Sequence, residues 1–145
     1  MRVSRRVAIC AGLAALAGGC SWFEDDAPEP AAEGPEGPVR EPVDAVERLE
    51  IGRTGQGIAL AAYGVAPGIG YAAPRLVARR EGRPGRDGML DFDFFVTPPD
   101  PRRNLPRGGA GARRVRADLL LDLDRVQGVR GIRVHAIEGG MQLFF

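Results

Sequence analysis

The sequence predicts an all-β protein, a small β-sandwich of about seven strands behind a disordered N-terminal leash. Two observations carry this prediction. Beyond residue 45, short apolar runs alternate with polar residues at a period of two, the spacing of a strand with one buried face. Glycine, proline and clusters of arginine and aspartate separate these runs at short intervals, as turns separate sandwich strands. Together they favour an immunoglobulin-like arrangement.

The predicted strands follow directly from these runs. The alternation is clearest in the fourth run, where Leu90, Phe92 and Phe94 share one face and Asp91 and Asp93 share the other. The seven runs cover residues 46–53, 57–65, 73–79, 88–96, 112–123, 131–137 and 140–145.

One run fits two structures. Leu119, Leu121 and Leu123 alternate with polar residues, which favours a strand. The same segment also carries leucines near helical spacing, and Gly128 would end such a helix. We predict a strand. The proline-rich residues 97–112 before it are expected to form a long loop, a length that in a small domain often marks function or mobility.

The first twenty residues have the pattern of a bacterial export signal. Three arginines precede an apolar run over residues 7–17, long enough for a signal peptide and too short to cross a bilayer as a helix. The run ends in LAGGC, residues 16–20, which resembles the lipobox of bacterial lipoproteins. The resemblance implies cleavage before Cys20 and acylation of its sulfur.

We therefore expect residues 1–19 to be a lipoprotein signal peptide and Cys20 to be a membrane anchor. Attachment through several acyl chains is stable because each buried CH₂ contributes about 0.8 kcal/mol. Ser21 follows the anchor where aspartate often retains a lipoprotein in the inner membrane, so it favours the outer membrane, facing the periplasm. Two alternatives stay open: an ordinary secretory signal, and twin-arginine export, whose motif SRRVAI at residues 4–9 resembles.

Residues 20–44 are expected to link the lipid to a folded domain at 45–145. From residue 21 this segment is acidic, and five prolines and two glycines interrupt it. Such a composition buries too little apolar surface to offset the entropy of ordering the chain.

The composition argues against several kinds of catalytic and metal-binding site. The chain has no lysine for a Schiff base, and after processing Cys20 is the one remaining cysteine, so no disulfide can form within the chain. A nucleophile and base would have to come from a lone threonine and His135, the sole histidine. A zinc site would need an almost purely carboxylate ligand set. We expect no catalytic residue, no metal and no cofactor.

Three other features receive plain interpretations. GIGYAA at residues 68–73 resembles a dinucleotide-binding loop, but Pro74 follows at once and no helical pattern does. His135 is expected to be an exposed strand residue. Aspartates on the predicted strands lack calcium-loop spacing, so we expect a solvated sheet face with partners such as Arg114 and Arg116. These aspartates are Asp91, Asp93, Asp118, Asp122 and Asp124.

Charge is distributed unevenly along the chain. Residues 21–50 hold ten acids and two arginines, a net charge of −8, whereas residues 75–116 hold eleven arginines and five acids, a net charge of +6. Arginines of the long loop are candidates to bind a partner carboxylate or phosphate in bidentate fashion. They are Arg102, Arg103, Arg107, Arg113 and Arg114. Solvated charges, or a linker folded back onto these arginines, are the alternatives.

Three segments share a further resemblance. APRLVAR (73–79), DGMLDFDFFVTPP (87–99) and VQGVRGIRVHA (126–136) are similar to a pattern in small, uncharacterised secreted proteins and lipoproteins of Proteobacteria. The resemblance implies a secreted β domain and carries no activity.

The sequence thus predicts an envelope lipoprotein that acts as a non-catalytic binding or structural module. Its expected partners are the membrane, through the lipid on Cys20, and an anionic envelope partner; no nucleic acid is expected. The alternative is a periplasmic hydrolase that uses the carboxylates of Asp91 and Asp93, which requires a pocket with two carboxylates about 5–9 Å apart.

Overall fold

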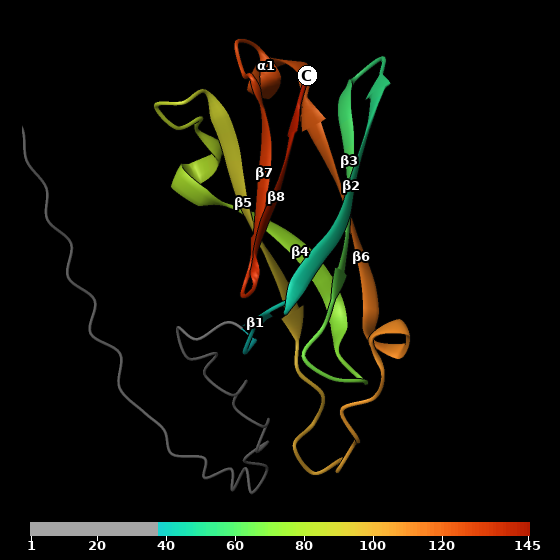
Figure 1. The fold of residues 1–145 in the computed structure, drawn as a ribbon. Helices are drawn as coiled ribbons and strands as arrows, with labels where there is room; N and C mark the ends of the chain where they lie inside the picture. The colour runs from blue at the N-terminus through green and yellow to red at the C-terminus, as the bar shows by residue number, and fades with distance from the viewer. Residues whose placement is uncertain (1–37) are drawn as a thin grey trace, which may run out of the picture. The chain divides into compact units, whose positions relative to one another are not determined.

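The computed structural model describes residues 38–145, so the predicted signal peptide, Cys20 and most of the predicted linker lie outside the described residues. The described chain is an all-β sandwich-like domain, which confirms the predicted fold class (Figure 1). Its strands are β1 (Glu41–Pro42), β2 (Ala45–Thr54), β3 (Gly57–Val65), β4 (Ala72–Ala78), β5 (Met89–Thr97), β6 (Arg114–Asp122), β7 (Gly131–Ala136) and β8 (Gly139–Phe144).

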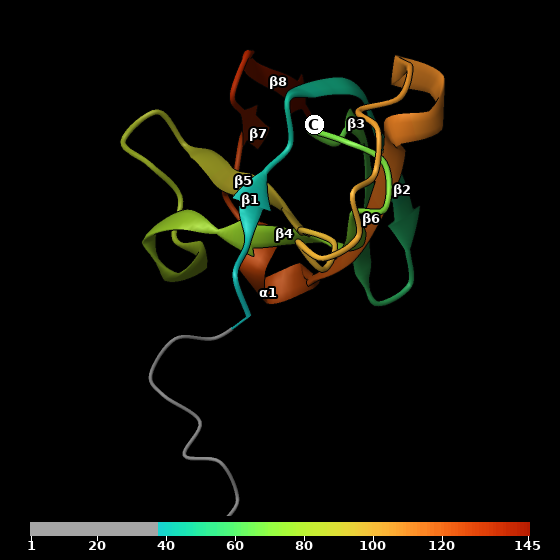
Figure 2. The same cartoon turned by 90° about the horizontal axis from the view of Figure 1, so that it is seen from below.

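The strands form two sheets. In the five-stranded sheet, β5 is the central strand and pairs with β4 along one edge. Its other edge is shared, because β7 runs parallel to residues 89–93 and the short β1 pairs further along; β8 then pairs with β7. The second sheet is antiparallel in the order β2-β3-β6. Since β2 lies next to β8 and β4 next to β6, the two sheets enclose the core, as Figure 2 shows from below.

The predicted alternation decides which side chains enter that core. Phe94 is fully buried between the sheets, and Leu90, Phe92 and Val96 point the same way from β5. Gly64 on β3 makes room for the aromatic ring, because a Cβ there would lie 2.9 Å from Phe94 Cε1. Ala62, which shares the core-facing side of β3 with Gly64, is buried as well, so small residues on one sheet accept the large side chains of the other.

The leucine-rich run for which the sequence allowed either a strand or a helix contains a strand followed by a short helix. Arg114–Asp122 is a strand, as predicted, and α1 (Leu123–Val126) is a single helical turn that follows it. Gly128 then takes a φ of +74° just beyond the turn, a conformation that glycine adopts without steric cost. The long loop before β6 ends in a 3₁₀ turn, η2 (Ala110–Arg113).

The folded domain includes Glu41–Asp44, which the sequence placed in the linker. Val43 is fully buried, and its N–H donates to the carbonyl of Phe94 at 3.0 Å. Glu41 accepts a hydrogen bond from Tyr71 Oη at 2.7 Å. The burial of Val43, the pairing of β1 with β5 and the bond to Tyr71 together hold this proline-containing, acidic segment in the sandwich. In the described part of the chain, no helix is long and apolar enough to span a membrane.

Candidate functional site

A buried carboxylate marks the most unusual place in the domain. Asp91 lies on β5 with its side chain turned away from Phe92 and the core, yet it is only 4% exposed. Its Oδ2 atom accepts a hydrogen bond from Arg80, and its Oδ1 atom accepts one from Arg133 Nη1 at 3.2 Å. His135 Nε2 lies 2.9 Å from the same Oδ1 atom. Because a carboxylate only accepts hydrogen bonds, Nε2 carries the proton in this contact.

The parallel pairing of β5 with β7 brings these groups together. Its register sets Asp91 opposite Arg133 and Asp93 opposite His135, so the acids of one strand face the bases of the next. Cross-strand pairs of opposite charge stabilise a sheet. Two segments that are about 40 residues apart in the sequence thereby form one electrostatic cluster.

The environment keeps Asp91 ionised. Burial by itself would raise the pKa of this carboxyl group, since it penalises the charged form. The hydrogen bond with His135 and the charges of Arg80 and Arg133 act in the opposite direction and outweigh burial, so the pKa of Asp91 lies below its ordinary value.

A left-handed turn supplies Arg80. The 3₁₀ element η1 (Arg79–Gly82) follows β4, and within it Arg80 and Glu81 have φ values of 51° and 56° and Gly82 has a φ of 76°. For a residue other than glycine, this conformation costs about 1–2 kcal/mol. The turn reverses the chain at the end of β4 and places the guanidinium of Arg80 over β5, where it closes Asp91 off from solvent.

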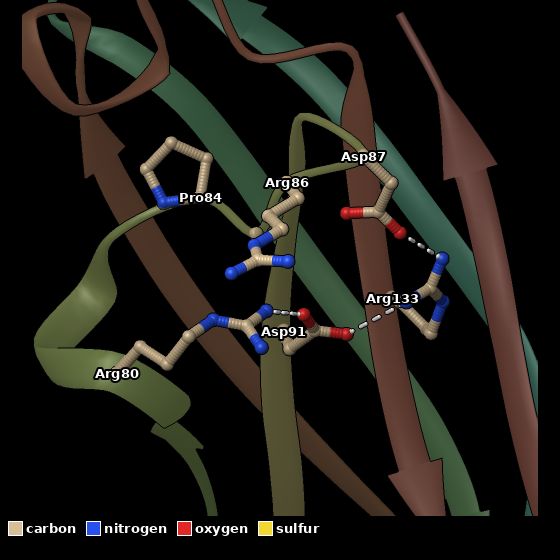
Figure 3. Close-up of a pocket in the computed structure, with 7 residues that line it drawn as sticks. Arg80, Pro84, Arg86, Asp87, Asp91 and Arg133 are labelled. Carbon is tan, nitrogen blue, oxygen red and sulfur yellow. Dashed lines mark hydrogen bonds and ion pairs between the residues drawn. The ribbon is translucent and has the colours of Figure 1, made fainter.

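An open pocket of about 530 Å³ lies beside this cluster (Figure 3). Arg80, Arg86 and Arg133 supply three guanidinium groups to its lining, and Asp87 and Asp91 supply two carboxylates. In Figure 3, Arg80 and Arg86 lie on one side of Asp91 and Arg133 lies on the other. The remaining lining residues are Pro84 and Gly85.

Both carboxylates of the pocket, Asp87 and Asp91, form ion pairs with pocket arginines, whereas Arg86 does not pair with either of them. Asp87 Oδ2 accepts a hydrogen bond from Arg133 Nη2 at 2.8 Å, and this bond is the main reason that the pKa of Asp87 lies below its ordinary value. Within residues 38–145, Arg86 forms no ion pair. The pocket therefore keeps one guanidinium whose N–H groups are available to a ligand.

The neighbouring ion pair between Arg79 and Asp93 has a different geometry from the contacts of Asp91 and Asp87. Asp93 accepts two hydrogen bonds from a single guanidinium, from Arg79 Nε at 2.9 Å and from Nη2 at 2.6 Å. This bidentate pairing satisfies both oxygens of Asp93 with one arginine.

The sequence predicted a solvated position for Asp91 and an exposed position for His135, and both predictions are wrong. Asp91 does not lie on a solvated face, and its partners are Arg80, Arg133 and His135 rather than Arg114 or Arg116. His135 is not a freely exposed strand residue either, since its side chain is 27% exposed and contacts Asp91. The cause is the turn after β4, which covers this part of the sheet and in which Arg80 and Glu81, residue types that seldom do so, adopt a left-handed conformation.

The other aspartates do not converge with Asp91. Asp118 lies on β6 in the second sheet, where it pairs with Arg116 at 2.7 Å and stays exposed, as predicted for a solvated face. Asp122 ends the same strand and Asp124 lies in α1. Among residues 38–145, no three acidic, histidine or cysteine side chains are grouped so as to hold a metal ion.

The predicted loop arginines do not form one surface. Arg113 is 13% exposed and donates from Nη1 to Asp44 Oδ2 at 2.8 Å and to the Ala66 carbonyl at 2.7 Å. Arg107 reaches the same Asp44 oxygen at 3.4 Å, and Arg114 pairs with Glu47 at 3.0 Å. Three of the five thus pair with acids near the start of β2, the kind of contact expected if the acidic segment folds back onto them.

Arg102 and Arg103 lie in the exposed turn after Pro101. The backbone N–H of Arg102 donates to Asp100 Oδ1 at 2.9 Å, and in the described residues neither guanidinium forms an ion pair. Cys20, the predicted lipidation site, lies outside the described residues.

The alternation in the sequence placed Asp91 and Asp93 on one strand face and His135 on another strand, but it did not indicate Arg80 or Arg86. The signal that was available is the arginine-rich segment REGRPGRDG (80–88), whose glycines and proline predict turns beside a strand that carries Asp91. Comparison with models of protein families, with curated proteins and with solved structures found no match to this chain. The function of the site therefore has to be argued from its own geometry.

Proposed function

We propose that this protein is a lipid-anchored component of the bacterial envelope whose β domain binds an anionic partner or ligand without catalysing a reaction. The observation that carries the proposal is the pocket beside Asp91, in which three guanidinium groups meet two carboxylates that are already bound. Such a site attracts negative charge and offers no group prepared for proton transfer.

The state of the carboxylates supports binding over hydrolysis. A hydrolase with two carboxylates needs one of them protonated as an acid and the other free as a base or nucleophile. Here Asp91 is held ionised by His135, Arg80 and Arg133, and Asp93 accepts hydrogen bonds from Nε and Nη2 of Arg79. These bonds would have to break before either carboxylate could react.

The lipid anchor remains the sequence's contribution to the proposal. Cys20 would hold the protein at the outer membrane, facing the periplasm, and the proline-rich linker would separate the domain from the bilayer. A proline-rich chain extends by about 3.1 Å per residue, so twenty residues span some tens of ångströms. The pocket could then reach ligands in the periplasmic space near the membrane.

Lipidation is tested by replacing Cys20 with serine and following both forms with a palmitate label and by membrane fractionation. The wild-type protein is expected to take the label and to sediment with membranes, and Cys20→Ser is expected to do neither. An unlabelled wild-type protein would refute the anchor.

The binding surface is tested by photo-crosslinking in the native cell. A photoreactive amino acid at Pro84, which lines the pocket, is expected to give a specific crosslinked product. The matched control is Gly111 in η2, at the end of the long loop, where a Cβ would meet no atom within 4 Å and folding should be undisturbed. A product from position 111 and none from position 84 would move the binding surface to the loop and contradict the proposal.

A further inference from the structure

We infer that the pocket formed by Arg80, Arg86 and Arg133 recognises a terminal phosphate group. This inference rests on the proposed binding role and names the chemistry of the ligand. The phosphate belongs either to a soluble phosphate ester or free phosphate, or to a lipid headgroup, because the same three guanidinium groups serve all of them.

The pocket carries an excess of positive charge, which favours an anion. Three guanidinium groups carry three positive charges, and Asp87 and Asp91 return two negative ones. Asp91 bonds to Arg80 and Arg133, and Asp87 bonds to Arg133 alone, so neither acid pairs with Arg86. In the described part of the chain Arg86 is exposed and has no ion-pair partner, so its guanidinium can bind an added anion.

The acids also hold the arginines in position. Arginine side chains lose considerable rotamer freedom when they bind a ligand, which weakens binding. The bonds from Asp91 to Arg80 and Arg133 restrict two of the three guanidinium groups before a ligand arrives. Each guanidinium has five N–H donors, so these bonds leave donors for a ligand.

The number and direction of the donors favour phosphate over carboxylate. The adjacent Arg79–Asp93 pair shows that one guanidinium satisfies both oxygens of a carboxylate in this protein. The pocket instead presents guanidinium groups from three places in the chain: the turn after β4, the loop before β5, and β7. Donors from several directions match the three terminal oxygens of a tetrahedral phosphate, for which arginine is a preferred partner.

The backbone is built around this arrangement. Arg80 is held in the left-handed region within η1, and strain of this kind gathers at functional sites. Gly85 leaves the space that the pocket needs, since a Cβ there would lie 2.7 Å from Asp87 Oδ1 and 2.8 Å from Arg80 Nη2. A side chain at position 85 would push both groups out of place.

Binding is measured by calorimetry on the mature, lipidated protein in non-ionic detergent at low salt, with inorganic phosphate and glycerol phosphate as probes. Arg86→Gln is the informative variant, because it removes a guanidinium without exposing Asp91. We expect it to weaken binding about tenfold or more, the effect of losing one or more charge-assisted hydrogen bonds. Arg102→Gln removes an exposed arginine elsewhere and is expected to bind like the wild type.

Two further probes identify the source and the chemistry of the ligand. Vesicles of phosphatidylcholine with and without phosphatidic acid show whether the phosphate belongs to a lipid. Binding that requires phosphatidic acid and Arg86 supports the inference with a lipid ligand, and binding of the soluble probes supports it with a soluble one. Acetate that binds as well as phosphate contradicts it, as does an Arg86→Gln variant that binds every phosphate probe like the wild type.

The outcomes separate this inference from the proposed function. If no phosphate probe binds while crosslinking from position 84 persists, the binding role stands and phosphate recognition is wrong. If phosphate binds but Cys20 takes no lipid, the pocket is confirmed and the envelope anchor is wrong.

Discussion

Replacing Asp91 with asparagine tests the electrostatic cluster directly. The change keeps the size of the side chain and removes its negative charge, while Arg80, Arg133 and His135 stay in place. The new amide N–H₂ group is a donor and faces other donors. The folded state loses the carboxylate's bonds, whereas in the unfolded chain both residues are solvated, so the free energy of unfolding must fall.

The size of this loss in the free energy of unfolding depends on how exposed the partners of Asp91 are to solvent. Removing one member of a fully buried ion pair costs about 3–5 kcal/mol. The side chains of Arg80, Arg133 and His135 are 50%, 31% and 27% exposed, so their charges regain part of their hydration after the change. We therefore expect a loss of about 2 kcal/mol, which at roughly 4–8 °C per kcal/mol lowers the Tm of a domain of this size by about 8–16 °C.

Urea unfolding of the wild type and the variant measures this difference. Asp118→Asn is the matched control, because Asp118 is 61% exposed and its bond to Arg116 should contribute less than about 1 kcal/mol. Since the pKa of Asp91 is lowered in the folded state, its contribution is present above the ordinary aspartate pKa of about 4 and disappears as pH falls through the lowered value. Equal stability of wild type and Asp91→Asn at pH 7 would refute the cluster.

Three further predictions concern other parts of the fold. Glu81→Gly should stabilise the domain by about 0.5–1 kcal/mol in thermal unfolding, because glycine accepts the left-handed φ of 56° and the exposed pair with Arg83 contributes little; a lower Tm would contradict this. A fragment that begins at residue 45 should be about 3 kcal/mol less stable than residues 38–145, since it loses buried Val43 and leaves Arg113 without its acidic partner Asp44, and equal urea midpoints would show that residues 41–44 contribute nothing. The hydrogen bond to Glu41 raises the pKa of Tyr71 to about 12. Stability present below pH 10 should therefore fall as pH rises from 10 to 12, by roughly 1 kcal/mol because water screens this bond; Tyr71→Phe should lack this loss, and a variant that shows the same loss as the wild type would refute the assignment.

The strands were predictable from the sequence because their signal is local. Alternation over β5, with Phe92 and Phe94 facing inward, located that strand to within one residue at each end. The run at 112–123 was harder, because a strand and a helical turn follow one another and their leucines merge into one pattern.

The candidate site was only partly predictable because it depends on long-range order. The strand faces that carry Asp91 and His135 could be identified. Their contact, however, requires β5 and β7 to pair in parallel, and the sequence of neither strand indicates which strand lies beside it. The approach of Arg80 requires a left-handed turn at residues that seldom adopt one. The pairing of Arg113 with Asp44 likewise depends on how the starts of β2 and β6 flank β3.

The most direct test of the phosphate-binding pocket is an NMR titration of the arginine Nε–Hε signals with inorganic phosphate. In the mature protein, the signals of Arg86 and Arg133 are expected to shift saturably, while those of Arg102 and Arg103 remain unchanged. Arg86 lines the pocket and Arg102 lies in the distant loop of the chain, so the two sets report different surfaces. Saturable shifts at Arg102 and Arg103, with Arg86 unaffected, would contradict the account.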